Sequence, residues 1–130
     1  MTGHEPWADR GAEPGVRGMS ADPPRPIPAP LTELVAGRFR VLSHPARVWL
    51  IDYLEWHGET NVQALADELG ATQQNASRHL GLLVQAGLLD RRREGRVVWY
   101  RLADTGAFAL IHTSAADILG ELGALDHPGG

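Results

Sequence analysis

The feature that most constrains this chain is a pair of short amphipathic helical patterns separated by a single residue. The first pattern starts at Thr60-Asn61-Val62-Gln63, which has the form of a capping box, and ends at Gly70. The second starts at Thr72, a residue type that caps helices, and ends at Gly87. The predicted inward-facing residues of the two helices are Leu65, Ala66, Leu69, Ala76, Leu80, Leu83 and Val84. Two short helices joined by a tight turn with glycine indicate a helix-turn-helix, although helical hairpins without a role in DNA binding also exist.

A β-hairpin is predicted directly after the second helix. Residues 88–93 and 96–102 flank Glu94-Gly95, and the second flank is rich in β-branched and aromatic residues. Such flanks around a two-residue turn with glycine in second place are typical of a hairpin. A helix-turn-helix followed by a hairpin is a winged helix. We therefore expect a mainly α fold with a small β-hairpin, a winged helix-turn-helix.

The charge of the chain is unevenly distributed. The formal net charge is -4, and all twelve basic residues are arginine. Residues 72–101 carry six of these arginines against only Asp90 and Glu94, which gives this segment a net charge of +4. A concentrated basic face can attract a polyanion even on an acidic protein. The alternative is a solvated hairpin with scattered charge.

Composition also divides the chain. The first thirty residues hold seven of the nine prolines and few aliphatic residues, which predicts a disordered Pro/Gly-rich tail over residues 1–30. One folded domain is expected over residues 31–125, followed by a flexible C-terminus at 126–130. Its first helix begins at Leu31. A second helix has Pro45 in its first turn and buries Val48, Trp49, Ile51 and Leu54.

The last helical segment has apolar residues spaced alternately three and four apart. They are Phe108, Ile111, Ala115, Ile118, Leu122 and Leu125. This seam of two residues in seven is narrower than a usual core-facing stripe and suits pairing between helices. We expect it to form a dimer interface; the alternative is that it packs back on its own domain.

Several short motifs, taken together, resemble the ArsR/SmtB family of winged-helix repressors. In chain order they are Phe39-Arg40-Val41-Leu42-Ser43-His44-Pro45-Ala46-Arg47, Leu65-Ala66, Ser77-Arg78-His79-Leu80, Gln85-Ala86-Gly87-Leu88-Leu89, Gly95-Arg96 and Tyr100-Arg101-Leu102. The resemblance covers about residues 33–122. It implies a homodimeric bacterial transcriptional repressor that binds a palindromic operator and is released by an inducer. It also implies a dimer interface built by the first and last helices, which adds Leu34 and Phe39 to the seam.

The second helix of the helix-turn-helix offers a polar face for double-stranded DNA. With Leu80 at the centre of its buried side, Gln74, Asn75 and Arg78 project from the opposite side. Asparagine and glutamine pair with adenine in the major groove, and arginine pairs with guanine. We therefore expect these three residues to contact base edges.

The other predicted DNA contacts are with the backbone. Thr72, Gln73 and Ser77 lie near the helix N-terminus, where free N–H groups attract phosphate. The wing arginines Arg91, Arg92, Arg93 and Arg96 are expected to contact the DNA backbone or the minor groove. His79 lies beside the DNA face and is included among the predicted DNA-binding residues; it is expected to pack or to contact phosphate and not to bind a ligand.

Metal sensing is common in relatives, but the ligand positions that the resemblance implies are not filled. Leu65-Ala66-Asp67-Glu68 occupies the place of a cysteine pair, and the chain has no cysteine. On the last helix Asp104 matches one ligand, whereas Gly106, Asp117 and Gly120 occupy the other three positions. Asp104 is then expected to cap that helix. We predict no metal site and no cofactor.

A nickel- or zinc-responsive repressor with histidine and carboxylate ligands remains an alternative. The histidines open to it are His44, His57, His112 and His127, together with an amino-terminal Thr2-Gly3-His4 site for nickel or copper.

Other functional classes have less support. No glycine-rich phosphate loop or nucleophile–base pair at motif spacing is present, so we expect no enzyme. No apolar run is long enough to span a membrane, and we expect a cytoplasmic protein without membrane partners. The rival from another class is a winged-helix protein-interaction module that acts with a co-regulator through Trp49, Trp56 or the proline-rich tail.

Overall fold

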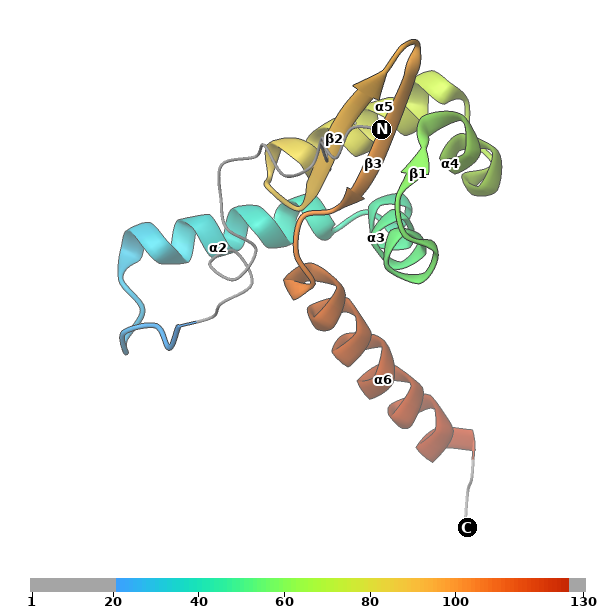
Figure 1. The fold of residues 1–130 in the computed structure, drawn as a ribbon. Helices are drawn as coiled ribbons and strands as arrows, with labels where there is room; N and C mark the ends of the chain where they lie inside the picture. The colour runs from blue at the N-terminus through green and yellow to red at the C-terminus, as the bar shows by residue number, and fades with distance from the viewer. Residues whose placement is uncertain (1–20, 127–130) are drawn as a thin grey trace.

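The computed structural model describes residues 21–126, with side chains described up to residue 123. In chain order the elements are α2 (Ala29–Leu42), α3 (Pro45–His57), β1 (Thr60–Asn61), α4 (Val62–Leu69), α5 (Gln73–Gln85), β2 (Leu89–Glu94), β3 (Val97–Leu102) and α6 (Gly106–Asp126). The three strands form one antiparallel sheet in the order β1-β3-β2, which lies against α3, α4 and α5 (Figure 1). The arrangement is a winged helix-turn-helix, as the sequence predicts.

The core lies where α3, α4, α5 and the base of the hairpin meet. Its largest fully buried apolar side chains are Leu50, Ile51, Leu65, Leu80, Leu83 and Leu89. The prediction for α3 was wrong in one respect, because Leu50 is fully buried whereas Val48 and Trp49 are only half-buried. α3 packs against α4, α5, α6 and β3. These neighbours cover residues on more than one side of the helix.

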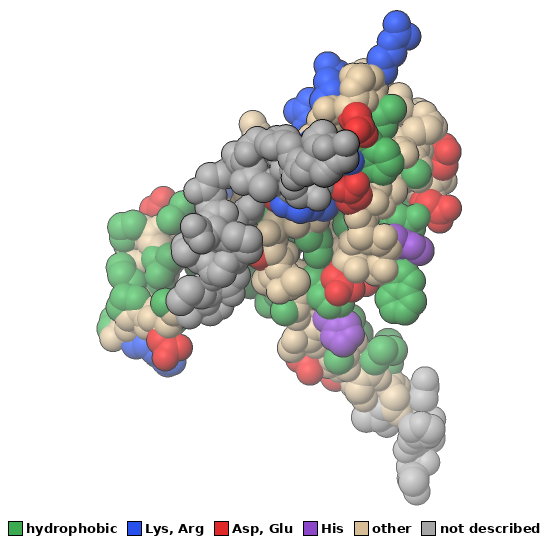
Figure 2. Space-filling view, in the orientation of Figure 1, with side chains coloured by type: hydrophobic (Ala, Val, Ile, Leu, Met, Phe, Trp, Pro, Cys, Tyr) green, Lys and Arg blue, Asp and Glu red, His purple; other side chains and the backbone are tan. Residues whose placement is uncertain are grey.

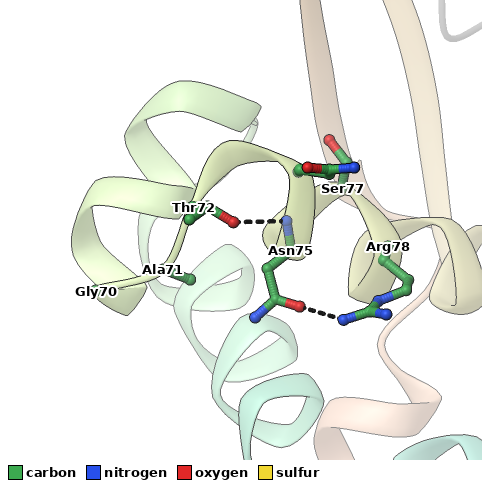
Figure 3. A pocket seen from close by; sticks show the side chains of 7 residues that line it. Gly70, Ala71, Thr72, Asn75, Ser77 and Arg78 are labelled. Atoms are coloured by element: carbon green, nitrogen blue, oxygen red, sulfur yellow. Dashed lines mark hydrogen bonds between the residues drawn. The ribbon is translucent and has the colours of Figure 1, made fainter.

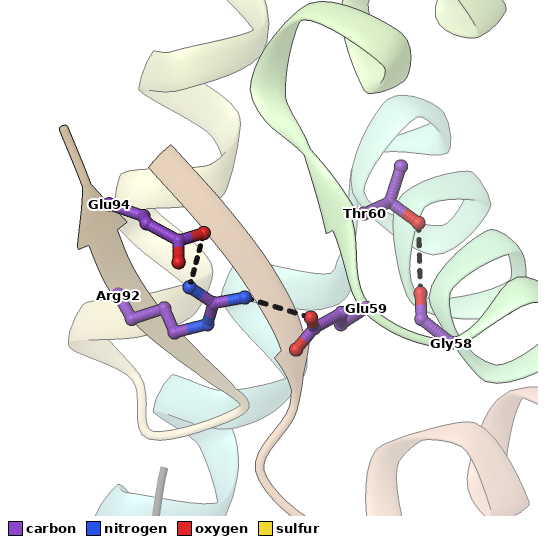
Figure 4. Close-up of polar contacts among 5 residues, drawn as sticks. All are labelled: Gly58, Glu59, Thr60, Arg92 and Glu94. Atoms are coloured by element: carbon purple, nitrogen blue, oxygen red, sulfur yellow. Dashed lines mark hydrogen bonds and ion pairs between the residues drawn. The ribbon is translucent and has the colours of Figure 1, made fainter. Parts of the chain in front are cut away.

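In the helix-turn-helix, side chains cap the starts of both helices, and a glycine with a left-handed backbone conformation ends the first one. Asn61 Oδ1 accepts a hydrogen bond from Ala64 N at 2.8 Å and caps α4, and Thr72 Oγ1 accepts one from Asn75 N at 3.0 Å and caps α5. Between the helices Gly70 has φ +73°, a conformation that strains residues with a Cβ. The expected cap Thr60 is instead in β1, where its hydroxyl donates to Gly58 O at 2.9 Å (Figure 4).

The hairpin turn lies one residue later than predicted. Glu94 pairs with Val97, so Gly95 and Arg96 form the turn, and Gly95 has φ +64°. A glycine with positive φ in the first central position is the pattern of a type II′ turn. Since neighbouring residues of a strand point to opposite faces, the strand pairing decides which arginines share a face. Arg91 and Arg93 lie on the face of Tyr100, whereas Arg92 lies on the face of Trp99.

Among the described helices, α2 and α6 extend away from the rest of the domain in different directions (Figure 1). α2 begins at Ala29, two residues before the expected start, and the described residues 21–28 ahead of it are exposed. Most of the predicted disordered tail, residues 1–20, and of the predicted flexible end, residues 127–130, lies outside the described residues. None of the described helices is long and apolar enough to cross a membrane.

Candidate nucleic-acid interface

α5 presents a polar face opposite the side chains that it buries. Ala76, Leu80 and Leu83 face the core. On the other side, an open hollow at the turn into α5 is lined by Gly70, Ala71, Thr72, Gln74, Asn75, Ser77 and Arg78 (Figure 3). The structure thus brings together the three predicted base-contacting residues and two of the three predicted phosphate contacts.

Within this face Asn75 and Arg78 contact each other. Arg78 NH2 donates a hydrogen bond to Asn75 Oδ1 at 2.6 Å, and Figure 3 shows the two side chains converging below the helix start. Asn75 is held in turn because its backbone N–H donates to the cap Thr72. The guanidinium is exposed, and it retains donors that do not bind Asn75.

Gln73, the remaining predicted phosphate contact, is connected to α4. Its Nε2 donates to Gln63 Oε1 at 2.9 Å, and Gln63 Nε2 donates to Asp67 Oδ1 at 3.0 Å. All three side chains are exposed. The sequence analysis missed Gln63 as a member of this surface. Its spacing of four residues from Asp67 is a readable helix signal, but its contact with Gln73 depends on how the two helices are packed.

Three of the four wing arginines are exposed. Arg91 and Arg93 lie on one face of the hairpin, and Arg96 lies in its turn. Figure 2 shows basic side chains gathered at the hairpin tip, at the top of the view. Together with Arg78 they form the basic part of the candidate interface. No acidic residue lies in the first turn of α5 to oppose an anion there.

The fourth wing arginine, Arg92, has partners within the chain that compete with its predicted DNA contact. Its NH2 pairs with Glu59 at 2.9 Å and its NH1 pairs with Glu94 at 3.2 Å (Figure 4). Its guanidinium also lies over the Trp99 ring, 5.3 Å from the centroid. The physical reason is the strand pairing, which places Arg92 on the face of the sheet opposite Arg91 and Arg93.

His79 is only 8% exposed, and its Nδ1 accepts a hydrogen bond from Arg47 Nε at 3.2 Å. Of the two roles that the sequence left open, the structure shows packing; the phosphate contact stays a prediction. Burial lowers the pKa of the imidazole, and the nearby His44, Arg47 and Arg78 lower it further. The sequence analysis missed Arg47, whose partner is 32 positions away along the chain.

Known proteins share this architecture. A helix-turn-helix domain model matches residues 42–92. The chain is 40% identical over 89 residues to a biofilm growth-associated repressor from Agrobacterium fabrum, covering 65% of this chain and 75% of that protein. It is 38% identical over 102 residues to the HTH-type transcriptional repressor SmtB of Mycobacterium tuberculosis, covering 78% of this chain and 70% of the relative. The chain belongs to the ArsR/SmtB family.

A solution structure from Mycobacterium bovis agrees with this assignment. It is described as the homodimeric winged helix-turn-helix DNA-binding domain of a possible ArsR-family transcriptional regulator. It matches with a TM-score of 0.60 at 29% identity, covering 79% of this chain and 91% of that domain. The ArsR/SmtB chain described here is therefore a DNA-binding transcriptional regulator and not an enzyme, as the sequence predicts.

The metal-ligand positions of this ArsR/SmtB chain have other contacts. Asp104 Oδ1 accepts a hydrogen bond from Gly106 N at 2.8 Å at the start of α6, but the expected N-cap position is filled by Thr105, whose carbonyl accepts from Ala109 N, so Asp104 lies one residue ahead of the cap. His44 Nδ1 accepts one from Ala46 N at 3.1 Å. Within the described part of the chain, no three histidine, aspartate or glutamate side chains are grouped as a metal ion would need. His4 and His127 lie outside the described residues.

The predicted dimer residues fall into two groups. Phe108 and Ile111 pack against the core of their own domain, which is the alternative that the sequence left open for the seam. The residues that remain exposed are Leu34 at 72%, Phe39 at 51%, Ile118 at 54% and Leu122 at 52%, together with Ala115. The side chain of Leu125 lies outside the described part of the structure.

Proposed function

We propose that this ArsR/SmtB regulator is a cytoplasmic repressor that binds a palindromic operator as a homodimer, with α5 in the major groove. The observation that carries this proposal is the Arg78 guanidinium, which is held by Asn75 on the exposed face of α5. A fixed, exposed guanidinium suits a bidentate contact with guanine. An α-helix that enters the major groove by its N-terminal part presents the first turns, where Gln74, Asn75 and Arg78 lie.

The contacts divide into base readout and backbone positioning. Arg78 and Gln74 read base edges, and Asn75 orients Arg78 while its amide nitrogen remains able to donate. Thr72, Gln73 and Ser77 contact phosphate near the start of α5. Arg91, Arg93 and Arg96 contact the DNA backbone or the minor groove. Arg92 is left out because it lies on the opposite face of the hairpin from Arg91 and Arg93.

The dimer joins α2 and α6 of one protomer with those of the other. An apolar groove between α2, the end of α5 and the start of α6 includes Leu34, Phe39, Leu82 and Leu110, and each of these is at least 37% exposed. Surface of this kind is costly to leave in water, and a second copy would cover it. The homodimeric state of the Mycobacterium bovis domain supports a dimer, and the exposed apolar groove is our reason for placing its interface here.

A second candidate function is recruitment of a co-regulator protein. Trp56 is 79% exposed near the end of α3, and the rings of Trp49, Tyr53 and His57 stack along that helix with centroids 4.9 and 4.1 Å apart. Exposed aromatic residues are common at protein interfaces. None of these four residues lines the hollow at the start of α5, so this surface is compatible with simultaneous DNA binding.

Selection of DNA from a randomised pool of duplexes tests the proposal. The full chain should enrich a sequence with two inverted half-sites whose centres lie about one helical turn apart. Enrichment of a single half-site would contradict the dimeric arrangement, and no enrichment over the input pool would contradict sequence-specific binding. A Leu34→Glu variant is the control, because it should lose the inverted repeat while its own winged helix stays intact.

A further inference from the structure

Arg47 connects three helices of the domain. It belongs to α3, its Nε donates to His79 Nδ1 on α5 at 3.2 Å, and its NH1 donates to Val41 O at the end of α2 at 2.8 Å. The side chain is half-buried, so both hydrogen bonds are partly shielded from water. A planar guanidinium with donors pointing in fixed directions is suited to holding two helices at once.

The bond to His79 requires a particular protonation state. An imidazole nitrogen that accepts a hydrogen bond carries no proton, so His79 must be neutral with its proton on Nε2. A second proton would turn Nδ1 into a donor facing the Arg47 donor. Protonation would therefore replace the hydrogen bond between α3 and α5 by a repulsion.

The charged or titratable groups that act on His79 are, among the described residues, His44 ahead of α3, Arg47 within α3 and Arg78 within α5, and none of them is a carboxylate. The His44 and His79 rings lie 4.6 Å apart at 53°, and the His44 ring is fixed by its hydrogen bond from Ala46 N. α4 and β2 also pack against α5 but add no carboxylate to this set. A proton gained by His79 would therefore not be neutralised locally.

We propose that Arg47 is a positioning residue for DNA recognition, that it holds α5 through neutral His79, and that protonation of His79 releases this hold and weakens specific binding. The inference rests on the proposed role of α5 as the recognition helix. Arg78 is the next residue to His79 on α5, so a small rotation or shift of this helix displaces the guanidinium that reads the base. Backbone contacts from the wing do not depend on this hold, so non-specific binding should persist.

The experiment measures the ratio of affinities for two duplexes at about pH 8 and about pH 5.5, at fixed salt. One duplex is the sequence that the wild-type chain selects at the higher pH, and the other is a scramble of it. The wild-type ratio should fall about tenfold or more between the two pH values. His79→Asn keeps an acceptor in the place of Nδ1 but does not titrate, so its ratio should change less than about twofold.

Two further variants separate positioning from folding. Arg47→Met removes both hydrogen bonds and keeps most of the stem, so its ratio should be low at both pH values. His112→Asn removes an exposed histidine on α6 and should respond to pH like the wild type. Helix content and the unfolding midpoint of each protein at both pH values show whether the domain stays folded. If His79→Asn does not fold, the weak pH response expected of Arg47→Met carries the test.

A wild-type ratio that does not change with pH would overturn the inference, and so would a His79→Asn ratio that falls as steeply as the wild type. These results leave the proposed function intact, because the chain still prefers its selected duplex at the higher pH. If the wild-type chain shows no preference at the higher pH either, the proposed function and the inference are both overturned.

Discussion

Asn75 Oδ1 and Arg78 NH2 lie 2.6 Å apart on the exposed side of α5, one turn from each other. Asparagine reads adenine with its oxygen and its nitrogen together. Because the Asn75 oxygen already binds Arg78, this residue is better suited to orienting the arginine than to reading a base alone. We therefore propose that Asn75 orients Arg78, and its predicted contact with a base edge stays a prediction.

Asn75→Ala should therefore reduce discrimination at the guanine read by Arg78. The free guanidinium would sample several rotamers, and we expect discrimination at that position to fall by about tenfold. Competition binding with duplexes substituted at single positions measures it. Coupling is tested with the double variant Asn75→Ala/Arg78→Ala, which should lose little more than Arg78→Ala alone. Fully additive losses would show that Asn75 reads DNA independently.

Arg93 and Arg92 form a matched pair on the wing, since they carry the same charge on neighbouring residues and lie on opposite faces. Arg93→Ala should remove one phosphate contact per subunit and lower the slope of log affinity against log salt by about two for a dimer. Arg92→Ala should leave this slope nearly unchanged, because its guanidinium binds Glu59 and Glu94. Equal slopes for the two variants would refute the assignment of faces.

Leu122→Glu should shift the chain toward monomers. The side chain is 52% exposed on α6, and a carboxylate there would be desolvated in a paired-helix interface. Thr113→Glu places the same charge on the opposite side of α6 and serves as the control. Sedimentation equilibrium measures both. A Leu122→Glu protein that stays dimeric would place the interface elsewhere.

The stability of the folded domain should depend on the protonation of His79. Burial first, and then His44, Arg47 and Arg78, hold its pKa below the ordinary 6.5, so the unfolded chain takes up this proton at a higher pH. The contribution of neutral His79 to the free energy of unfolding is complete above pH 6.5. It is lost as the pH falls through the lowered pKa. Urea unfolding of the wild type and His79→Asn should give free energies that diverge below pH 6.5. A wild type that gains stability relative to the variant there would contradict the direction of the shift.

Local signals in the sequence predicted much of this fold. Thr72, Gly70 and the apolar spacing around Leu80 fix helix ends and faces through contacts within a few residues, and those predictions agree with the structure. The hairpin was placed correctly, but its turn was off by one residue, because glycine suits either central position of a two-residue turn. β1 has only two residues and is defined by its pairing with β3, so no periodic pattern in the sequence could predict it.

In the candidate site, too, features set by local helix geometry were predicted and contacts between distant residues were not. The polar face of α5 follows from helix geometry, so Gln74, Asn75 and Arg78 were predicted together. The contacts of Arg92 and Arg47 were not predicted, because their partners Glu59 and His79 are 33 and 32 positions away along the chain. Such contacts depend on how elements pack, which a single sequence does not state.

The central claim is that α5 reads DNA through Arg78. The most direct test compares Arg78→Ala with the wild type on the selected duplex and its scramble, across a series of salt concentrations. Arg25→Ala, which removes an equal charge from the exposed segment ahead of α2, is the control. We predict that Arg78→Ala loses about tenfold to a hundredfold in affinity for the selected duplex and little for the scramble, whereas Arg25→Ala matches the wild type. Wild-type affinity of Arg78→Ala for the selected duplex at every salt concentration would contradict the claim.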